Sequence, residues 1–337
     1  MDLDPGNNLI IGQNASGKTS ILEAVAFLGR GRSFRGANTR EVVRHGQDCF
    51  VVFGKALEGG RLVSLGVRNG GGGLEVHVDG ESQSSAAILA EALPLQVIDP
   101  DVHELIAGGP ENRRRYIDWL AFHVEHGFLD LWRRYRRTLK QRNAGLRNGV
   151  DARGLAAWDQ ELVELGEAVS EARIRVLDVT RIALEEHGEA LLGGPVDFDY
   201  QRGWAGEKTL EEALSLSLDR DRQVGTTHAG PHRADLKLKL GERIARKLVS
   251  RGQQKLLACA LILAATEIVQ THSEQPLLLL LDDPAAELDG ESLSRLMHQV
   301  AGLACQVIAT GLDRNQNLFA AAPRVFHVEQ GVVTQAD

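Results

Sequence analysis

One stretch near the start of the chain, Gly12–Thr19, fits the glycine-rich phosphate-loop pattern G-x-x-x-x-G-K-[ST] at every position. The apolar run 9–11 precedes it and predicts a buried strand. Residues 20–28 follow it with apolar side chains at helical spacing. Glycines allow such a loop to wrap around phosphates, while N–H groups at the helix N-terminus point toward them. The strand–loop–helix order therefore predicts a P-loop α/β domain that binds the phosphates of a nucleotide.

Two side chains of this loop have predicted roles in the chemistry. Lys18 is expected to neutralise the β- and γ-phosphates and so to contribute to catalysis, and the Thr19 hydroxyl is expected to ligate Mg²⁺. The candidate nucleotide-binding residues of the loop are Gly12, Gln13, Asn14, Ala15, Ser16, Gly17, Lys18 and Thr19.

Composition narrows the class of protein. The chain has 337 residues, enough for two domains or for one large domain with an insertion. Its formal net charge of −8 argues against a uniformly basic surface, but not against a local basic patch. The three cysteines lack metal-ligand spacing and predict reduced thiols. Met1–Pro5 does not resemble a signal peptide, and the longest apolar run, Leu277–Leu281, is too short to span a bilayer. We therefore expect a cytoplasmic protein with no membrane role of its own.

Strand-like patterns occupy the next part of the chain. Residues 49–79 predict an antiparallel meander with a turn at Gly59, and residues 93–98 predict a further strand that ends before Asp99. Gln96 is a weak candidate for a metal-sensing glutamine, and a strand glutamine without such a role is the preferred interpretation. The basic, glycine-containing loop 29–36 is compatible with contact to nucleotide or DNA, and equally with a plain exposed loop.

From Glu111 to about residue 190 the pattern becomes helical. It predicts two long helices joined by a glycine turn at 145–154, which form an α-hairpin inserted into the α/β domain. The second helix carries a heptad-like apolar seam. The seam consists of Trp158, Leu162, Leu165, Val169, Ala172, Val176, Val179 and Ala183.

The first helix of this hairpin is rich in arginine. Four of its cations share one face by helical spacing, opposite an apolar face with Tyr135. The run is single in sign and interleaved with aromatic residues, which favours DNA contact over a merely solvated helix face. The cations of the run are Arg133, Arg134, Arg136, Arg137, Lys140, Arg142 and Arg147, and those on one face are Arg133, Arg136, Arg137 and Lys140.

Two further motifs lie in the last third of the chain. Ser250–Lys255 opens an apolar helix, so a serine hydroxyl, backbone N–H groups and the helix dipole are available to an anion. The apolar run 277–281 ends in Asp282 and Asp283, at the edge of the sheet where a phosphate loop also lies. Asp282 is expected to hold the metal through water, and Asp283 to orient or deprotonate the attacking water. The segment 230–233 favours a structural turn over a ligand contact, and 235–240, 307–310 and 325–328 predict strands.

Together these motifs resemble the ABC-type ATPase heads of the SMC class, and within that class the RecF family. The resemblance rests on the phosphate loop, the inserted hairpin, the S-x-G-Q-Q-K signature and the L-L-L-L-D-D-x-x-x-E-L-D segment, in that order. Further matching segments are 31–35, 113–118, 230–233 and 250–257. It implies an ABC-type lobe I at 1–104 and 225–337 and a helical lobe II at 105–224.

The resemblance also implies a mechanism. Two subunits would form a head-to-tail homodimer, with ATP held between Lys18 and Ser250, Gly252 and Gln253 of the partner subunit. ATP would close the dimer on DNA, at junctions of single and double strands, and slow hydrolysis would reopen it. With RecO and RecR such proteins help RecA load at gaps, in repair, replication restart and the SOS response.

The sequence departs from the family pattern in four places. The family has further residues before the equivalent of Pro5, which suggests a late start site or a truncated chain. Ala15 replaces a glycine, which is tolerable where φ is negative. Ala286 replaces a common serine, so a hydrogen bond at the dimer interface is expected to be missing. Asp283 also replaces the glutamate common in relatives. An ATP-binding structural dimer with little or no turnover is therefore the alternative, and a transport ATPase subunit is disfavoured.

Overall fold

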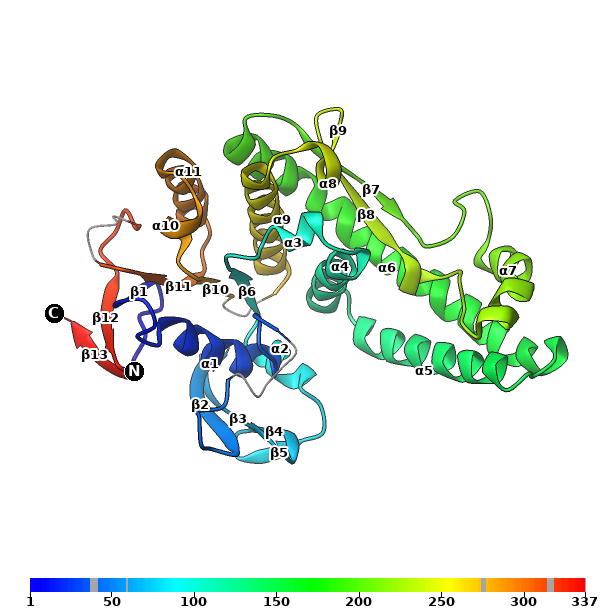
Figure 1. Ribbon diagram of the computed structural model, residues 1–337, viewed down its shortest axis with the longest axis horizontal. Coiled ribbons are helices and arrows are strands. Elements are labelled where there is room, and N and C mark those ends of the chain that lie inside the picture. The colour runs from blue at the N-terminus through cyan, green and yellow to red at the C-terminus, as the bar shows by residue number, and fades with distance from the viewer. Residues whose placement is uncertain (37–41, 59, 274–276, 314–317, 337) are drawn as a thin grey trace. The chain divides into compact units, whose positions relative to one another are not determined.

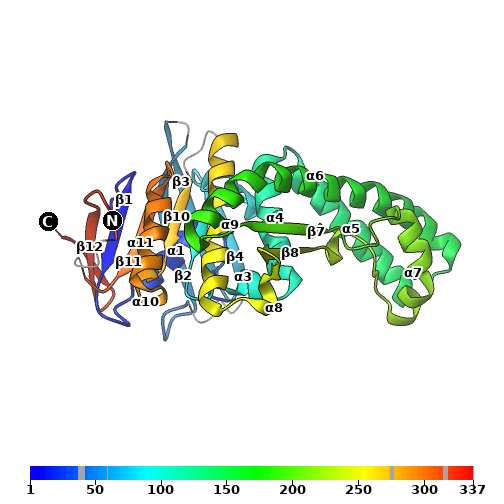
Figure 2. The same ribbon diagram turned by 90° about the horizontal axis from the view of Figure 1, so that it is seen from above.

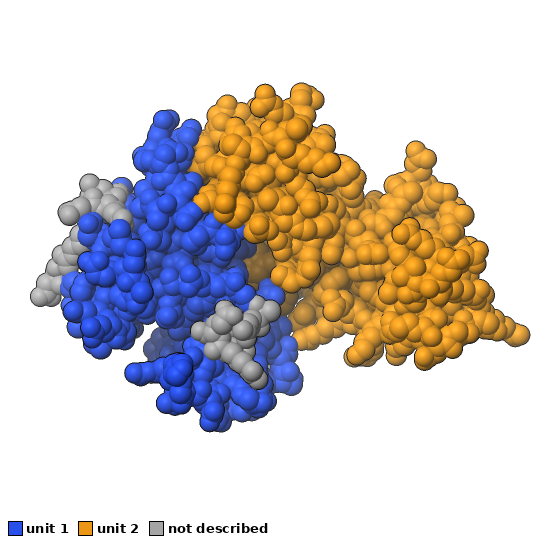
Figure 3. Space-filling view, viewed as in Figure 1, with its two compact units in different colours: residues 1–102, 259–337 blue, residues 103–258 orange. Residues whose placement is uncertain are grey.

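The computed structural model describes residues 1–36, 42–58, 60–273, 277–313 and 318–336. The chain forms two compact units, coloured separately in Figure 3. Unit 1 consists of Met1–Val102 and Cys259–Asp337, and unit 2 is His103–Ala258. Unit 2 continues beyond the predicted return at residue 225 because the strands β7 (Val196–Gln201) and β8 (Asp235–Leu240) pair with each other. The assignment of lobe I to 1–104 and 225–337, and of lobe II to 105–224, stays a prediction.

Unit 1 is built on a six-stranded sheet with the order β13-β12-β1-β11-β10-β6. Figure 2 shows β12, β1, β11 and β10 side by side. All neighbours are parallel except β13, which is antiparallel to β12. Parallel strands are normally buried on both faces, which explains the continuous apolar runs noted in the sequence. The strands are β1 (Asn7–Ile11), β6 (Leu95–Ile98), β10 (Leu278–Leu281), β11 (Gln306–Gly311), β12 (Arg324–Glu329) and β13 (Val332–Ala336).

The helix α1 (Lys18–Arg30) connects two apolar cores of unit 1. Its Leu22 and Ala26 pack against the six-stranded sheet, while Phe27 and Leu28 pack into the core of a second sheet. The helix ends at Gly31, whose φ of 62° allows its N–H to bond to the Phe27 carbonyl. Shorter helices complete the unit, namely α2 (Ala87–Ala92), α10 (Pro284–Glu287) and α11 (Gly290–Ala301).

The second sheet of unit 1 confirms the predicted meander. It is antiparallel, with the order β2-β3-β4-β5, and its strands are β2 (Cys49–Glu58), β3 (Arg61–Gly70), β4 (Gly73–Val78) and β5 (Glu81–Gln83). The predicted turn residue Gly59 lies outside the described residues. His77 is exposed on the polar face of β4, as its alternation predicted.

Unit 2 contains the predicted α-hairpin. The helices α5 (Phe128–Arg147) and α6 (Ala152–Leu192) run alongside each other in Figure 1 and pack closely. The predicted turn at 145–154 was too wide. Gly149, with a φ of 71°, forms the turn, but Gly145 lies inside α5. A Cβ at Gly145 would come within 2.7 Å of the Trp158 ring, so this glycine permits close helix packing instead.

The predicted seam of α6 agrees with the observed burial except near its carboxyl end, at Val179. Leu162, Val169 and Val176 are buried, but Val179 is 45% exposed and Thr180 is buried in its place. A straight helix drifts relative to a seven-residue repeat, which explains the shift by one position.

The remaining elements of unit 2 surround this hairpin. They are the helices α3 (Glu104–Ala107), α4 (Pro110–Val124), α7 (Leu210–Val224) and α8 (Ala245–Leu248), the short η2 (Pro231–Arg233), and a sheet of β7, β8 and β9 (Arg243–Ile244). The predicted alternation of β8 is confirmed, with Leu236 and Leu238 buried.

The helix α9 (Arg251–His272) contains residues of both units. Among the described helices, α9 is the one that is long and apolar enough to cross a membrane by length and composition alone. However, 72% of its most apolar window is buried inside the protein, as is usual for the core helix of a globular domain.

Candidate functional site

The predicted site residues of unit 1 gather at the carboxyl edge of the six-stranded sheet. Gly12 follows β1, Asp282 follows β10, and Thr310 lies next to the end of β11. Because these strands are parallel neighbours, their ends meet at the same edge. Residues far apart in sequence are thereby brought into hydrogen-bond contact.

The phosphate loop has the backbone geometry that its glycines predict. A Cβ at Gly12 would lie 2.4 Å from the Val328 carbonyl oxygen, and Gly17 has a φ of 111°. The backbone of Ala15 does not have the negative φ under which we expected an alanine to be tolerated. Its φ is +64°, so the condition under which an alanine is tolerated without strain is not met. The Ser16 hydroxyl oxygen is buried and has no hydrogen-bond partner among the described residues.

Lys18 folds back over the loop that precedes it. Its Nζ donates to the carbonyl oxygens of Gly12 at 2.7 Å and Gln13 at 3.0 Å, and the residue is only 7% exposed. The ammonium group is therefore held at the loop by backbone carbonyls, which are neutral, so its positive charge is not cancelled by these contacts.

The predicted metal residues Thr19 and Asp282 are in contact. The Thr19 Oγ1 donates to Asp282 Oδ1 at 3.1 Å, and the Thr310 Oγ1 donates to the same oxygen at 3.0 Å. The Thr310 oxygen also accepts from the backbone N–H of Asp283 at 2.8 Å. Sequence reasoning placed Thr310 in a strand without giving it a role, although a hydroxyl at the end of an apolar strand was an available signal.

Asp283 has an unusual backbone and an unsatisfied oxygen. Its φ of 49° is in the left-handed region, and its Oδ1 is buried without a hydrogen-bond partner in the described structure. Burial raises the pKa of this carboxyl, while the positive charge of Lys18 acts in the opposite direction. A carboxyl group of this kind is suited to accepting a proton or orienting a water molecule.

A further carboxylate at this edge was missed. Asp99 follows β6, and burial, together with the charges of Asp101 and Asp282, raises its pKa to about 6. Its position directly after an apolar strand was the available signal. Gln96 has a structural partner, because its Oε1 accepts from the Arg30 guanidinium at 3.2 Å. That contact agrees with the preferred interpretation of Gln96.

The basic loop after α1 is attached to that helix by a buried carboxylate. Glu23 accepts from the Ser33 hydroxyl at 3.0 Å and from the Arg35 N–H at 3.2 Å. Burial raises the pKa of Glu23, and these hydrogen bonds partly offset the rise. The loop is therefore held to the helix that begins at the phosphate loop.

The predicted signature residues lie at the start of α9, in unit 2. The Ser250 Oγ accepts from the Gln253 N–H at 3.3 Å, and Gln253 Oε1 accepts from the Ser250 N–H at 3.1 Å. This reciprocal pair is a capping box. Ser250 and Gly252 are exposed, and a Cβ at Gly252 would meet no atom, so this helix terminus is open to solvent. Ala286, at the predicted interface position, is also exposed.

The predicted basic face of α5 is exposed. We call the set Arg133, Arg136, Arg137 and Lys140 the basic face. Arg142 does not belong to the surface run that the sequence suggested. It is fully buried, and its guanidinium pairs with Asp221 at 2.8 Å and Asp159 at 2.5 Å. Arg142 faces the other side of α5, where its charge is neutralised by these carboxylates.

The turn at 230–233 has a structural role, as the sequence favoured. The Tyr135 hydroxyl lies 2.6 Å from His232 Nδ1, and His232 Nε2 lies 3.0 Å from the Thr227 carbonyl oxygen. Since a carbonyl can only accept, Nε2 carries the proton and Nδ1 accepts from the tyrosine. Burial lowers the pKa of His232 to about 4.

Among the described residues, no group of three or more His, Cys, Asp or Glu side chains is arranged to hold a metal ion. The donors at the sheet edge are instead one hydroxyl and one carboxylate, Thr19 and Asp282. This is the small number of protein ligands typical of Mg²⁺ sites that share the ion with a nucleotide.

Comparison with known families gives a consistent result. The family described as "RecF/RecN/SMC N terminal domain" matches residues 1–334. The chain is 43% identical to the "DNA replication and repair protein RecF" of Azotobacter vinelandii (strain DJ), covering 98% of this chain and 93% of that protein. It is 42% identical to the protein of the same name from Pseudomonas fluorescens (strain SBW25), covering 98% and 92%.

Solved structures show the same fold. A structure described as the recombination mediator protein RecF with ATP in the RecFOR pathway has a TM-score of 0.88 at 24% identity, covering all of this chain and 93% of that one. An Smc head bound to the C-winged helix domain of ScpA has a TM-score of 0.60 at 17% identity, covering 100% and 91%. The fold is thus that of an α/β P-loop ABC-type ATPase head with an inserted helical hairpin.

Proposed function

Because the chain belongs to the RecF family, we propose that it is a DNA-binding protein of replication and repair that dimerises when it binds ATP. The observation that supports this most is the contact of Thr19 with Asp282 beside the Lys18 loop. It joins the two predicted halves of a nucleotide site from opposite ends of the sequence.

The loop residues fit a triphosphate. The Ser16 hydroxyl is a buried polar atom without a partner in the described structure, and Gly12 lets the loop pack against the Val328 carbonyl oxygen, which any Cβ would meet. Lys18 would supply a positive charge that its carbonyl partners leave uncancelled. The N–H groups at the start of α1 would point at the same anion.

The residues at the sheet edge fit Mg²⁺. Thr19 would ligate the ion through its hydroxyl, and Asp282 would hold it, most simply through water. Bound there, Mg²⁺ would offset the charge of the phosphates. Thr310 would keep the Asp282 carboxylate in place, since it donates to the same oxygen.

Asp283 is the proposed base for slow hydrolysis. Its raised pKa and buried, unpartnered Oδ1 support a role in orienting an attacking water and taking its proton. Lys18 would assist by stabilising charge on the phosphates.

The exposed start of α9 supports the proposed dimer. Ser250, Gly252 and Gln253 would contact the nucleotide held by Lys18 of the partner subunit. The start of this 22-residue helix is exposed, and its dipole would favour an anion there once such a ligand is present. Two such sites would form in a head-to-tail pair.

The basic face of α5 supports the proposed DNA contact. Its four exposed cations are unlike the acidic chain as a whole. Each phosphate that they neutralise would release counterions, so affinity would fall steeply with salt. By family membership we propose junctions of single- and double-stranded DNA as the target. We propose RecR and RecO as partners, and RecA loading at gaps and the SOS response as the setting.

Filter binding tests the proposed function. Retention of gapped DNA is expected to require ATP and Mg²⁺, to fall with salt, and to be lost in Lys18→Met. Equal, salt-insensitive retention with and without ATP would contradict the proposal.

A second candidate is an ATP-binding structural dimer with little turnover. The observation in its favour is that a short, strained aspartate, Asp283, occupies the position of the proposed base. Phosphate release with saturating DNA separates the two. Turnover that disappears in Asp283→Asn supports the ATPase, and no turnover in the unaltered protein supports the structural dimer.

A further inference from the structure

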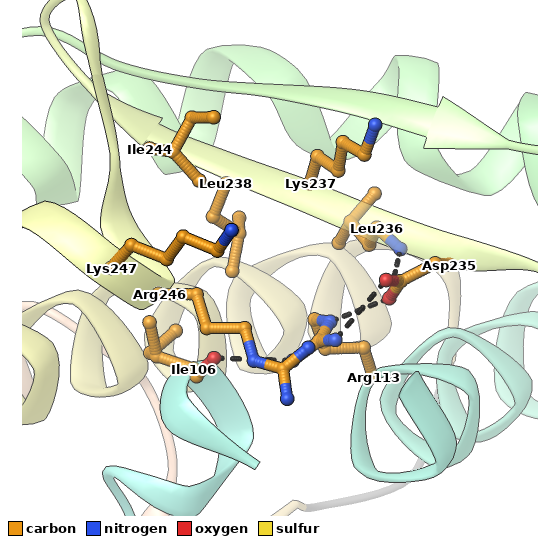
Figure 4. A pocket seen from close by; sticks show the side chains of 9 residues that line it. All are labelled: Ile106, Arg113, Asp235, Leu236, Lys237, Leu238, Ile244, Arg246 and Lys247. Carbon is orange, nitrogen blue, oxygen red and sulfur yellow. Dashed lines mark hydrogen bonds and ion pairs between the residues drawn. The ribbon is translucent and has the colours of Figure 1, made fainter. Parts of the chain in front are cut away.

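Unit 2 contains a hollow that the proposed function does not use. It lies between β8, β9, α3, α8 and the start of α4, and has a volume of about 230 Å³ (Figure 4). Its lining combines aliphatic side chains with several cations. The lining residues are Ile106, Arg113, Asp235, Leu236, Lys237, Leu238, Ile244, Arg246 and Lys247.

The one acidic group of the lining is already neutralised. Asp235 accepts from Arg113 through both oxygens, at 2.7 Å from Nε and 3.2 Å from Nη2. Arg113 also donates to the carbonyl oxygens of Ile106 and Gly108, at 3.1 and 3.0 Å, so its hydrogen bonding is largely complete. This pair, with Arg113 buried and Asp235 half-buried, forms part of the wall and adds no net charge.

Two other cations are available to a ligand. Arg246 uses Nε to donate to the Ala107 carbonyl oxygen at 3.1 Å, and no hydrogen bond of its terminal nitrogens occurs within the described residues. Figure 4 shows its guanidinium directed toward the Arg113 end of the hollow. Lys247 is exposed and makes no ion pair within the described chain. Lys237 points away from the centre and lies opposite Asp199 in the β7–β8 register, so we do not count its charge.

The floor of the hollow is apolar and aliphatic. Leu236 and Leu238 are buried beneath it, while Ile244 at its edge is 44% exposed. No aromatic side chain lines the hollow, so a nucleic-acid base would find no stacking surface there. An aliphatic side chain of a protein fits both the volume and the surface.

We propose that this hollow is a docking site for an acidic peptide segment that carries an apolar side chain. The apolar side chain enters the hollow over Leu236 and Leu238. Flanking carboxylates bind Arg246 and Lys247. The site goes beyond the proposed function, because none of these residues belongs to the nucleotide site or to the basic face.

Fluorescence anisotropy on the intact chain without nucleotide tests the proposal. The probe is a short fluorescein-labelled peptide of alternating aspartate and leucine. It is expected to bind the chain, with an affinity that falls as the salt concentration rises. Unlabelled peptides with asparagine for aspartate, or serine for leucine, should compete at least about tenfold less well. Equal competition by the asparagine peptide would overturn the assignment.

Matched variants locate the binding. Arg246→Gln combined with Lys247→Gln should weaken peptide binding at least about tenfold, whereas Lys239→Gln, an exposed lysine of β8 outside the hollow, should change it less than about twofold. Ile244→Glu should weaken it as well by adding a negative charge to the edge. The docking site would be refuted if Lys239→Gln weakened peptide binding as much as the double variant does, or if the peptide did not bind at all. It would also be refuted if single-stranded DNA, and not the peptide, bound to the same residues.

Because the assay contains no ATP and no DNA, it separates this site from the proposed clamp. Peptide binding that persists in Lys18→Met is expected. Failure of the peptide to bind a chain that still retains DNA with ATP would reject the docking site alone.

Discussion

The Asp282 carboxylate organises the site at the scale of single residues. One of its oxygens accepts hydrogen bonds from Thr19 and Thr310, and the Thr310 oxygen accepts from the Asp283 N–H. This chain of contacts fixes the position of Asp283 relative to the loop helix. It also explains why an aspartate in a left-handed conformation is retained at that point, since the surrounding contacts hold it.

We predict that Asp283→Asn removes most phosphate release and leaves ATP binding intact. Asparagine has the same shape and tolerates the left-handed conformation, but it cannot accept a proton. We expect turnover to fall by roughly 10² to 10⁴-fold. Radiolabelled ATP binding is measured alongside phosphate release. An Asp283→Asn variant with unchanged turnover would exclude this residue as the base.

Ala15 gives a prediction about stability. Its φ of +64° is unfavourable for alanine, whereas glycine adopts it freely. We expect Ala15→Gly to raise the free energy of unfolding by up to about 1 kcal/mol. The control is Ala24→Gly within α1, which should lower it by about 1 kcal/mol. Urea unfolding measures both, and a loss of stability in Ala15→Gly would show that the loop does not hold this conformation.

Because His232 is buried in its neutral form, we predict that the free energy of unfolding depends on pH. His232 has a folded-state pKa of about 4, below the ordinary value of 6.5, because burial disfavours its charged form. Its neutral form therefore contributes stability above pH 6.5, which is lost as pH falls toward 4, by up to about 3 kcal/mol. Asp99 acts in the opposite direction, since its pKa is raised to about 6.

Comparison of variants isolates this contribution. His232→Gln should flatten the fall in unfolding free energy between pH 6.5 and 4, while His77→Gln on the exposed face of β4 should not. Denaturant titrations at several pH values measure the difference. Parallel curves for the unaltered protein and His232→Gln would contradict the assigned pKa.

At the scale of elements, α5 has two sides with different surroundings. The basic face is exposed, whereas Arg142 on the other side is fully buried against Asp221 and Asp159. The first side faces solvent. The second side joins α5 to α6 and α7 through a polar network that includes Thr227.

We predict that a substitution on the buried side of α5 causes a large loss of stability. Arg142→Met would leave Asp221 buried without its main partner, and we expect a cost of about 3 to 5 kcal/mol. Arg137→Met on the basic face should change stability by less than about 0.5 kcal/mol. Thermal or urea unfolding measures both changes. Similar small effects for the two would show that the buried ion pair contributes little.

We predict that substitutions on the exposed side of α5 weaken DNA binding. Glutamine substitutions across the basic face should weaken DNA binding and reduce its salt dependence, because fewer counterions are released. The control replaces four exposed cations elsewhere with glutamine, namely Lys55, Arg61, Lys208 and Arg222. Equal weakening by the control set would assign the effect to net charge alone.

How far the sequence determines these elements depends on the range of the interactions. Local patterns predicted the loop, the meander and the α5–α6 hairpin, because periodicity reports burial directly. They failed for Arg142, whose partner Asp221 is distant in the chain, and for Val179, where helical drift changed the buried position. They also gave no role to Thr310, since its function depends on two neighbouring strands meeting at one edge.

At the scale of the whole molecule, the proposed nucleotide site is divided between two copies. Lys18, Thr19 and Asp282 belong to unit 1, and Ser250 and Gly252 belong to unit 2, where the start of α9 is exposed. A triphosphate bound at the loop would complete its contacts with the exposed helix terminus of the partner subunit. In the proposed function, ATP would thereby act as the ligand that favours the dimer over the monomer.

Light scattering with paired variants is the most direct test of this central claim. With ATP and Mg²⁺ the unaltered protein should have the mass of a dimer. Lys18→Met alone should remain a monomer, because it does not hold the triphosphate, and Ser250→Arg alone should do so because its helix tip is blocked. Mixed together, the two variants should form a heterodimer through the one composite site that remains intact. A monomer mass for the folded, unaltered protein at saturating ATP, or dimers formed equally by each variant alone, would contradict the account.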